Sequence, residues 1–145
     1  MDVEGQLAGS EPAYGFTARL ARVGFEEARR RITEALANEG FGVLTEIDVQ
    51  ATLKKKLGTD FRKYVILGAC NPKLAERALS SELGIGLLLP CNVCVWQEGE
   101  TSVVSIADPN AMFQIVQSPR LQPIADEAGR RLRAALEACQ APATH

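Results

Sequence analysis

One segment constrains the fold more than any other. Residues 64–70, Tyr-Val-Ile-Leu-Gly-Ala-Cys, are almost continuously apolar, and Asn71 and Pro72 follow directly. An unbroken apolar run is typical of a strand covered on both faces, because a strand with one wet face alternates apolar with polar residues. Asn accepts hydrogen bonds from the free backbone N–H groups of a helix start, and Pro suits the first helical position. The sequence therefore predicts a buried strand that leads straight into a helix.

The remaining pattern predicts an α+β, two-layer sandwich. Further strands are predicted at 16–20, 41–47, 91–96 and 101–107, the last two joined by a hairpin turn at 97–100. Helices are predicted from Gly24 to a stop at 38–40, from Asp48 to Gly58, and from Pro119 or Pro123 to Cys139, with a short helical turn at 111–117. This order has too few crossovers for a doubly wound sheet. It favours a mainly antiparallel sheet with helices on one face.

Length and composition predict one domain with two short tails. The chain has 145 residues, which is the usual size of a single domain. Residues 1–13 are small, polar and rich in Gly and Pro, and we interpret them as a disordered N-terminal tail. The domain is expected to span 14–139, and 140–145 to form a C-terminal tail.

Charge and hydropathy exclude some classes of partner. The net charge is −2, from 16 basic and 18 acidic residues, which argues against a dedicated nucleic-acid binder with a dense basic face. The longest apolar run, 85–89, is far too short to cross a membrane. The acidic N-terminus does not resemble a signal peptide. We therefore expect a cytoplasmic protein whose four cysteines are reduced thiols.

Apolar residues on both sides of the central strands predict a partner. Tyr64, Ile66, Val93 and Val95 alternate with further apolar residues on the same strands, whereas the helices can cover only one face of the sheet. A monomer rarely leaves a large apolar face in water. We predict a homodimer that buries this face. The alternative is that the face lines a pocket for an apolar ligand.

Residues for catalysis are sparse. His145 is the only histidine and ends the chain, so a histidine-based triad or metal cage is not expected. Gly84-Ile85-Gly86 lacks the third glycine of a dinucleotide-binding loop. The carboxylates near element ends read as caps and turns rather than as a catalytic pair. The sequence favours a non-enzymatic protein without a cofactor, and a hydrolase or lyase that uses Asp or Lys groups is a third, weaker alternative.

The cysteines are the most informative polar set. Cys70 precedes a helix start, where the helix dipole favours a thiolate. Cys91 and Cys94 are three residues apart on a predicted strand, which places them on opposite faces and weakens a Cys-x-x-Cys interpretation. Free cysteine is often buried, so a plain core role for all four stays open. A thiol-dependent redox or soft-metal site from Cys70 and Cys91, with Cys94 as a further metal candidate, is the functional alternative.

These residues mark the candidate site. Two asparagines and two thiols flank otherwise apolar segments, and an antiparallel arrangement of the two strands would bring them to the same end of the sheet. We therefore predict a small-ligand site formed by Cys70, Asn71, Pro90, Cys91 and Asn92. The two asparagines also suit simple capping and turn roles, and that alternative stays open.

Two strings in the chain resemble the family called domain of unknown function 302. They are residues 64–72, Tyr-Val-Ile-Leu-Gly-Ala-Cys-Asn-Pro, and 84–93, Gly-Ile-Gly-Leu-Leu-Leu-Pro-Cys-Asn-Val, supported by 48–58 and the Asp108-Pro109 turn. The resemblance covers roughly residues 14 to 139. It implies a curved antiparallel sheet in a TATA-binding-protein-like arrangement, but no activity and no catalytic residues. Cys94 departs from the family pattern, in which a plain aliphatic residue is more usual.

Overall fold

The computed structural model describes residues 11–141, so most of the two predicted tails, 1–10 and 142–145, lies outside the described residues. The predicted order of strands and helices is confirmed, with one added 3₁₀ helix between α4 and β4. The elements are β1 (Gly15–Ala21), α2 (Phe25–Asn38), β2 (Gly42–Asp48), α3 (Val49–Leu57), β3 (Tyr64–Cys70), α4 (Pro72–Ser81), η1 (Leu83–Leu88), β4 (Cys91–Glu98), β5 (Thr101–Ala107), α5 (Pro109–Phe113) and α6 (Gln122–Gln140).

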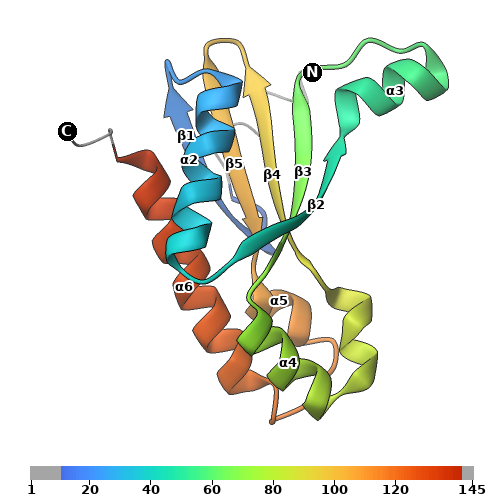
Figure 1. Cartoon of the computed structure of the whole chain (residues 1–145), viewed down its shortest axis with the longest axis vertical. Helices are drawn as coiled ribbons and strands as arrows, with labels where there is room; N and C mark the ends of the chain where they lie inside the picture. The colour runs from blue at the N-terminus through green and yellow to red at the C-terminus, as the bar shows by residue number, and fades with distance from the viewer. Residues whose placement is uncertain (1–10, 142–145) are drawn as a thin grey trace.

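The five strands form one sheet in the order β1-β5-β4-β3-β2 (Figure 1). Every neighbouring pair is antiparallel, as predicted. Gly99, at φ 60°, makes the tight turn between β4 and β5, where a residue with a side chain would be strained. The chain is therefore an α+β domain built on an open antiparallel sheet.

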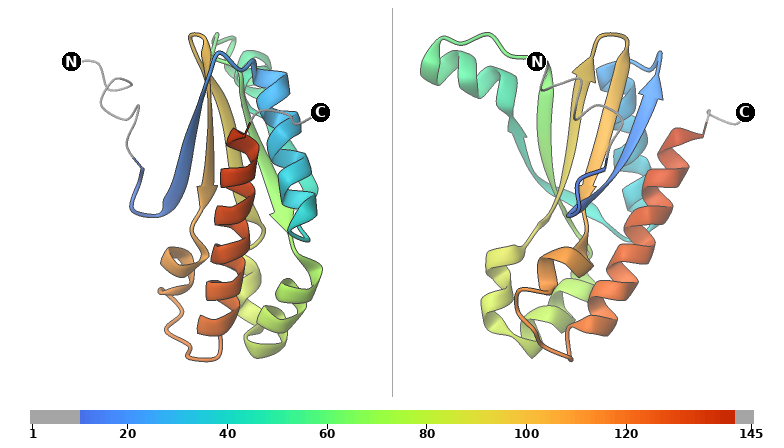
Figure 2. Two further views of the ribbon diagram at one scale, coloured as in Figure 1. Left: turned by 90° about the vertical axis from the view of Figure 1, so that its left-hand side faces the viewer. Right: turned by 180° about the vertical axis from the view of Figure 1, so that it is seen from behind.

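Helices α2 and α6 cover one face of this sheet. Figure 2 shows both on the same side of the strands when the sheet is viewed nearly edge-on. One side of α2 is buried against the sheet, and its residues are Phe25, Ala28, Ile32, Ala35 and Leu36. Each fully buried Ile, Leu or Phe side chain contributes roughly 1.5–3 kcal/mol to folding. Helix packing on this face therefore supplies the main core of the molecule.

The strand register separates the four residues that sequence reasoning grouped together. Val93 and Val95 lie under the helices and are fully buried, opposite Leu67 and Val65 of β3. Tyr64 and Ile66 are half-buried and pair with Trp96 and Cys94, which places these four on the other face. We call the helix-packed side the covered face and the opposite side the open face. Within residues 11–141 the helices leave the open face uncovered.

The segment from β2 to α3 forms an arm that projects from the body of the molecule (Figure 1). Helix α3 forms as predicted: Asp48 accepts a hydrogen bond from the Ala51 amide at 2.9 Å, and Gly58 ends the helix in the left-handed conformation. However, none of the described residues of α3 is buried, and Leu57 is 71% exposed. The helix extends beyond the edge of the sheet, so its apolar side has no core to pack on.

None of the helices within residues 11–141 has both the length and the apolar character that a membrane crossing requires.

Candidate functional site

The predicted site residues gather at one end of the sheet. Strands β3 and β4 are antiparallel, and Ala69 lies opposite Cys91. The end of β3, with Cys70 and Asn71, therefore lies beside the start of β4, with Pro90 to Asn92. This is the antiparallel arrangement that the sequence analysis named as the condition for one site formed by both segments.

A separation of strands opens a cavity at this end. The pairing of β4 with β5 stops at Val93 opposite Ile106. Beyond that point β4 stays with β3 down to Cys91, while β5 stays with β1 down to Ala107. Within residues 11–141, Asn92 and Ala107, where the ladder would continue, do not pair. The two strand ends diverge, and the space between them is closed by η1 and α5.

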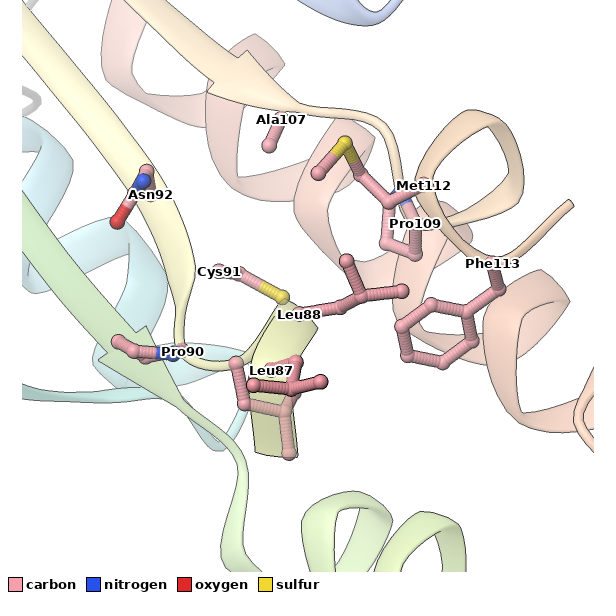
Figure 3. A pocket seen from close by; sticks show the side chains of 10 residues that line it. Leu87, Leu88, Pro90, Cys91, Asn92, Ala107, Pro109, Met112 and Phe113 are labelled. Carbon is pink, nitrogen blue, oxygen red and sulfur yellow. The ribbon is translucent and has the colours of Figure 1, made fainter. Parts of the chain in front are cut away.

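This outer cavity has a volume of about 180 Å³. Figure 3 shows its walls, which come from η1, the start of β4, the end of β5 and α5. Asn92 lies on one side, and Met112 and Phe113 lie on the opposite side. All of its lining residues are uncharged: Leu87, Leu88, Leu89, Pro90, Cys91, Asn92, Ala107, Pro109, Met112 and Phe113.

A second, inner cavity of about 30 Å³ lies next to the outer one. The two share the wall formed by Leu89, Pro90, Cys91, Pro109 and Phe113. Cys70 and Asn71 line the inner cavity only, together with apolar residues of α4 and α6. Since one water molecule needs roughly 10–15 Å³ of such volume, the inner cavity has room for little more than solvent.

Asn71 performs a structural task. Its Oδ1 accepts a hydrogen bond from the Leu74 amide at 3.3 Å and caps α4, and its Nδ2 donates to the Glu39 carbonyl at 3.4 Å. The side chain is buried, at 8% exposure. A side chain on Gly40, which has φ 86°, would come within 2.9 Å of the same Nδ2. Because both ends of the amide are engaged, Asn71 holds α2 and α4 together and offers little to a ligand.

Asn92 is the opposite case. It is exposed at the start of β4, and its side-chain amide has no hydrogen-bond partner within residues 11–141. An amide offers two donors and one acceptor oxygen. Of the predicted site residues, Asn92 is therefore the one whose polar group is available to a bound molecule.

Pro90 shapes the wall between the cavities. The Leu89–Pro90 peptide bond is cis. The Pro90 ring lies directly over Gly68 of β3: a side-chain carbon on Gly68 would come within 2.8 Å of the proline Cγ and would collide with the hydroxyl of Thr45. The start of β4 can approach β3 this closely because residue 68 has no side chain.

The thiols are held in their protonated form. Burial raises the pKa of Cys91 to about 11, and the nearby Cys70 adds to the rise. Burial also raises the pKa of Cys70, against the lowered value that the adjoining helix start predicted. Burial at the end of β3 disfavours the charged form of the Cys70 sulfur. Neither thiol is an activated nucleophile at neutral pH.

The other two cysteines lie elsewhere. Cys94 lies on the open face opposite Ile66, whereas Cys91 shares the other side with Ala69, which confirms that the Cys-x-x-Cys pair is split between faces. Cys139 is buried in the core, and its Sγ lies 3.1 Å from the Leu136 carbonyl. Within residues 11–141, no three His, Cys, Asp or Glu side chains are grouped so that they could hold a metal.

Sequence reasoning missed one side of the outer cavity. Ala107, Pro109, Met112 and Phe113 come from the end of β5 and from α5. Their types are ordinary for strand ends and short helices, so the residues alone gave no signal. The predicted hairpin between the two strands could have indicated these residues, because it places residue 107 beside residue 92.

Comparisons with known proteins were made on the whole chain. The family model described as domain of unknown function DUF302 matches residues 16–139. A crystal structure of an uncharacterized conserved DUF302 protein from Bacillus stearothermophilus is 36% identical, with a TM-score of 0.81 over 88% of this chain and 99% of that one. No curated protein matches the chain.

These findings agree with the resemblance carried by residues 64–72 and 84–93. The family match spans almost the whole described domain, and the solved structure has the same fold over nearly its full length. The chain belongs to the DUF302 family, the domain of unknown function 302.

Proposed function

We propose that the domain is a non-enzymatic, homodimeric binding module that takes a small molecule into the outer cavity. The observation that carries the proposal is the divergence of β4 and β5, which leaves about 180 Å³ between two ordered strand ends. A cavity of roughly 150 Å³ in an apolar interior is enough to admit benzene. The lining residues include no Asp, Glu, Lys, Arg or His, so the cavity has no ordinary general acid or base.

Xenon gas tests whether this cavity accepts a guest, because xenon enters apolar cavities without specific contacts. In methyl-labelled protein, xenon pressure is expected to shift the NMR signals of Leu88 and Met112. The variant Ala107→Phe places a ring in the same space and should abolish the shifts. Unchanged Leu88 and Met112 signals in the folded wild-type protein would contradict the proposal.

The homodimer is supported by the chemistry of the open face. Tyr64 and Trp96 stack there with ring centroids 5.3 Å apart and planes at 6°, and Phe61 lies against Tyr64 at 6.2 Å. Ile47, opposite Ile66 at the edge of this face, is 51% exposed. Aromatic clusters of this kind are enriched at protein interfaces.

Charge on the open face also suits contact with a second copy. Arg19 and Glu98 form an ion pair at 3.0 Å, and the Trp96 indole N–H donates to the same carboxylate at 2.8 Å. The Glu98 carboxylate is thus paired within the face, and Arg62 adds a second cation near it. In a two-fold symmetric contact each surface meets its own copy, so a carboxylate that is paired within the face limits like-charge repulsion.

Two matched variants test the dimer. Ile47→Asp adds a charge to the open face, whereas Ile115→Asp adds the same charge to an isoleucine that is 75% exposed beyond α5. Sedimentation velocity at micromolar concentration should show a dimer for the wild type and for Ile115→Asp, and a monomer for Ile47→Asp, because a buried unpaired carboxylate disrupts an interface. A monomeric wild type, or equal masses for the wild type and both variants, would refute the dimer.

A second candidate function is soft-metal binding by Cys70 and Cys91. Both thiols line the inner cavity, and the charge of one raises the pKa of the other, so they lie close together. Cu(I) prefers sulfur ligands and displaces the thiol proton. Titration with Cu(I) would support this function if one equivalent bound tightly to the wild type with proton release and not to Cys91→Ser. Equal binding by both proteins would exclude it.

A further inference from the structure

We propose, on the basis of the binding function above, that the outer cavity selects a neutral molecule with one six-membered ring and a single hydrogen-bonding substituent. The ring would lie against Met112 and Phe113, and the substituent would meet the side-chain amide of Asn92. Phenol is the simplest member of this class.

Charge excludes most common metabolites. All ten residues that line the cavity are uncharged, so an entering carboxylate, phosphate or ammonium group would find no counter-charge. A charged group that leaves water without a partner loses far more hydration than a neutral one. The cavity is therefore selective for neutral molecules.

The wall opposite Asn92 is suited to a flat ring. Figure 3 shows the Phe113 ring, the Met112 thioether and the Leu88 side chain gathered on that side. Aromatic rings contact other rings and thioether sulfur favourably, beyond the gain from burial alone. The Cys91 sulfur is directed toward the same side, and as a protonated thiol it behaves as a small apolar group.

One side chain supplies the polar end of the cavity. Within residues 11–141 the Asn92 amide is the one side-chain hydrogen-bonding group of the lining other than the Cys91 thiol, and it has no partner in the protein. It can accept from a hydroxyl or donate to a carbonyl. It lies at the point where β4 and β5 separate, so a ligand group placed there would bridge a gap that no strand pair closes.

Size sets the upper limit. About 180 Å³ is slightly more than the roughly 150 Å³ that holds one benzene ring. The space therefore fits one ring with one small substituent, and a fused three-ring system would not fit.

Three probe molecules separate these features: phenol, toluene and benzoate, titrated into methyl-labelled protein and followed by NMR. Phenol should bind more tightly than toluene by about fivefold, because a hydrogen bond to Asn92 is added. Benzoate should bind at least about tenfold more weakly than phenol, because its charge has no partner. All three should perturb the methyl signals of Leu88 and Met112 if they bind at all.

Variants assign the selectivity. Asn92→Leu should reduce phenol affinity to that of toluene and leave toluene binding intact. Asn38→Leu, which changes an exposed asparagine at the end of α2, is the matched control and should leave both affinities unchanged. Ala107→Phe should abolish binding of phenol and toluene, and Met112→Trp provides a second blocked cavity if that variant fails to fold.

Each outcome has a distinct meaning. Benzoate affinity equal to that of phenol, or equal phenol affinity in the wild type and Asn92→Leu, would overturn the ligand class while leaving the binding function intact. Entry of xenon without binding of either neutral ring would overturn the class in the same way. Failure of xenon and of both rings to enter would overturn the binding function itself.

Discussion

The two faces of the sheet are made from alternate residues of the same strands, yet they have different physical roles. On the covered face Leu67, Val93 and Val95 are fully buried beneath α2 and α6. On the open face their sequence neighbours Ile66 and Cys94, with Tyr64, are only half-buried. Both sets are largely apolar, so composition does not distinguish them. The difference arises because the helices pack on one face of the sheet and not on the other.

The open face is nevertheless ordered by its own side chains. Thr17 and Ser105 share a hydrogen bond at 2.9 Å across β1 and β5, and Glu98 joins Arg19 to the Trp96 indole. Cross-strand pairs of this kind hold side chains in fixed positions on a sheet surface. The face is therefore preorganised, which lowers the entropy cost of contact with a partner. The covered face stabilises the chain, and the open face is the one that we propose for assembly.

The largest predicted effect compares two adjacent residues of β3. Leu67→Ala removes a fully buried side chain from the covered face and should lower the free energy of unfolding by about 3–5 kcal/mol. Ile66→Ala removes a half-buried side chain and should cost less than half as much at concentrations where the protein is monomeric. Urea denaturation at low protein concentration measures both. Equal losses of free energy would show that the two faces are equally packed within one chain, and would contradict the difference between the covered and the open face.

A smaller effect compares the two thiols at either face of β4. The pKa of Cys91 is raised by burial from an ordinary 9.0 to about 11, so the folded state keeps its proton where the unfolded state has lost it. The stability that this thiol contributes is complete below pH 9 and is lost as the pH rises through 11. The loss is on the order of 2 kcal/mol.

Cys91→Ala should remove that part of the alkaline decline, as measured by denaturation between pH 8 and pH 11. Cys94→Ala is the control on the open face. Burial also raises the pKa of Cys94, but a hydrogen bond with Tyr64 counters part of the rise, so the decline should change less. A larger change in Cys94→Ala than in Cys91→Ala would mean that the open face is the more desolvated one in solution.

Local sequence patterns predicted most of the fold. The strand at 64–70, the Asn71-Pro72 start and the helix from Gly24 each depend on neighbours in the chain, and all three elements are confirmed. Cover on the second face of that strand stays a prediction. What the patterns missed depends on register. Val93 and Val95 could be placed on the covered face only once Leu67 and Val65 were known to lie opposite them.

The candidate site shows the same limit. The antiparallel pairing of β3 with β4 brings residues 70–71 and 90–92 together. The sequence alone did not decide whether these two strands run antiparallel. The outer cavity exists because one ladder stops at Val93 while its neighbours continue, and no residue type encodes that stop. The helix start that follows Cys70 favours a thiolate, but burial, a tertiary property that the sequence does not state, raises the pKa of this thiol.

The smallest effect tests whether the arm formed by β2 and α3 belongs to the same cooperative unit as the body. Asp48→Ala removes the hydrogen bond to the Ala51 amide at the start of α3 and should destabilise that helix by about 1 kcal/mol. Because α3 buries no residue, the loss should stay local: amide hydrogen exchange in 49–57 should speed up about fivefold, with no change at Leu67. Asp60→Ala is the control on the same arm, since it removes only an exposed ion pair with Lys54. If Asp48→Ala accelerated exchange at Leu67 as much as in α3, the arm would unfold together with the covered face, and its lack of buried contacts would not make it independent.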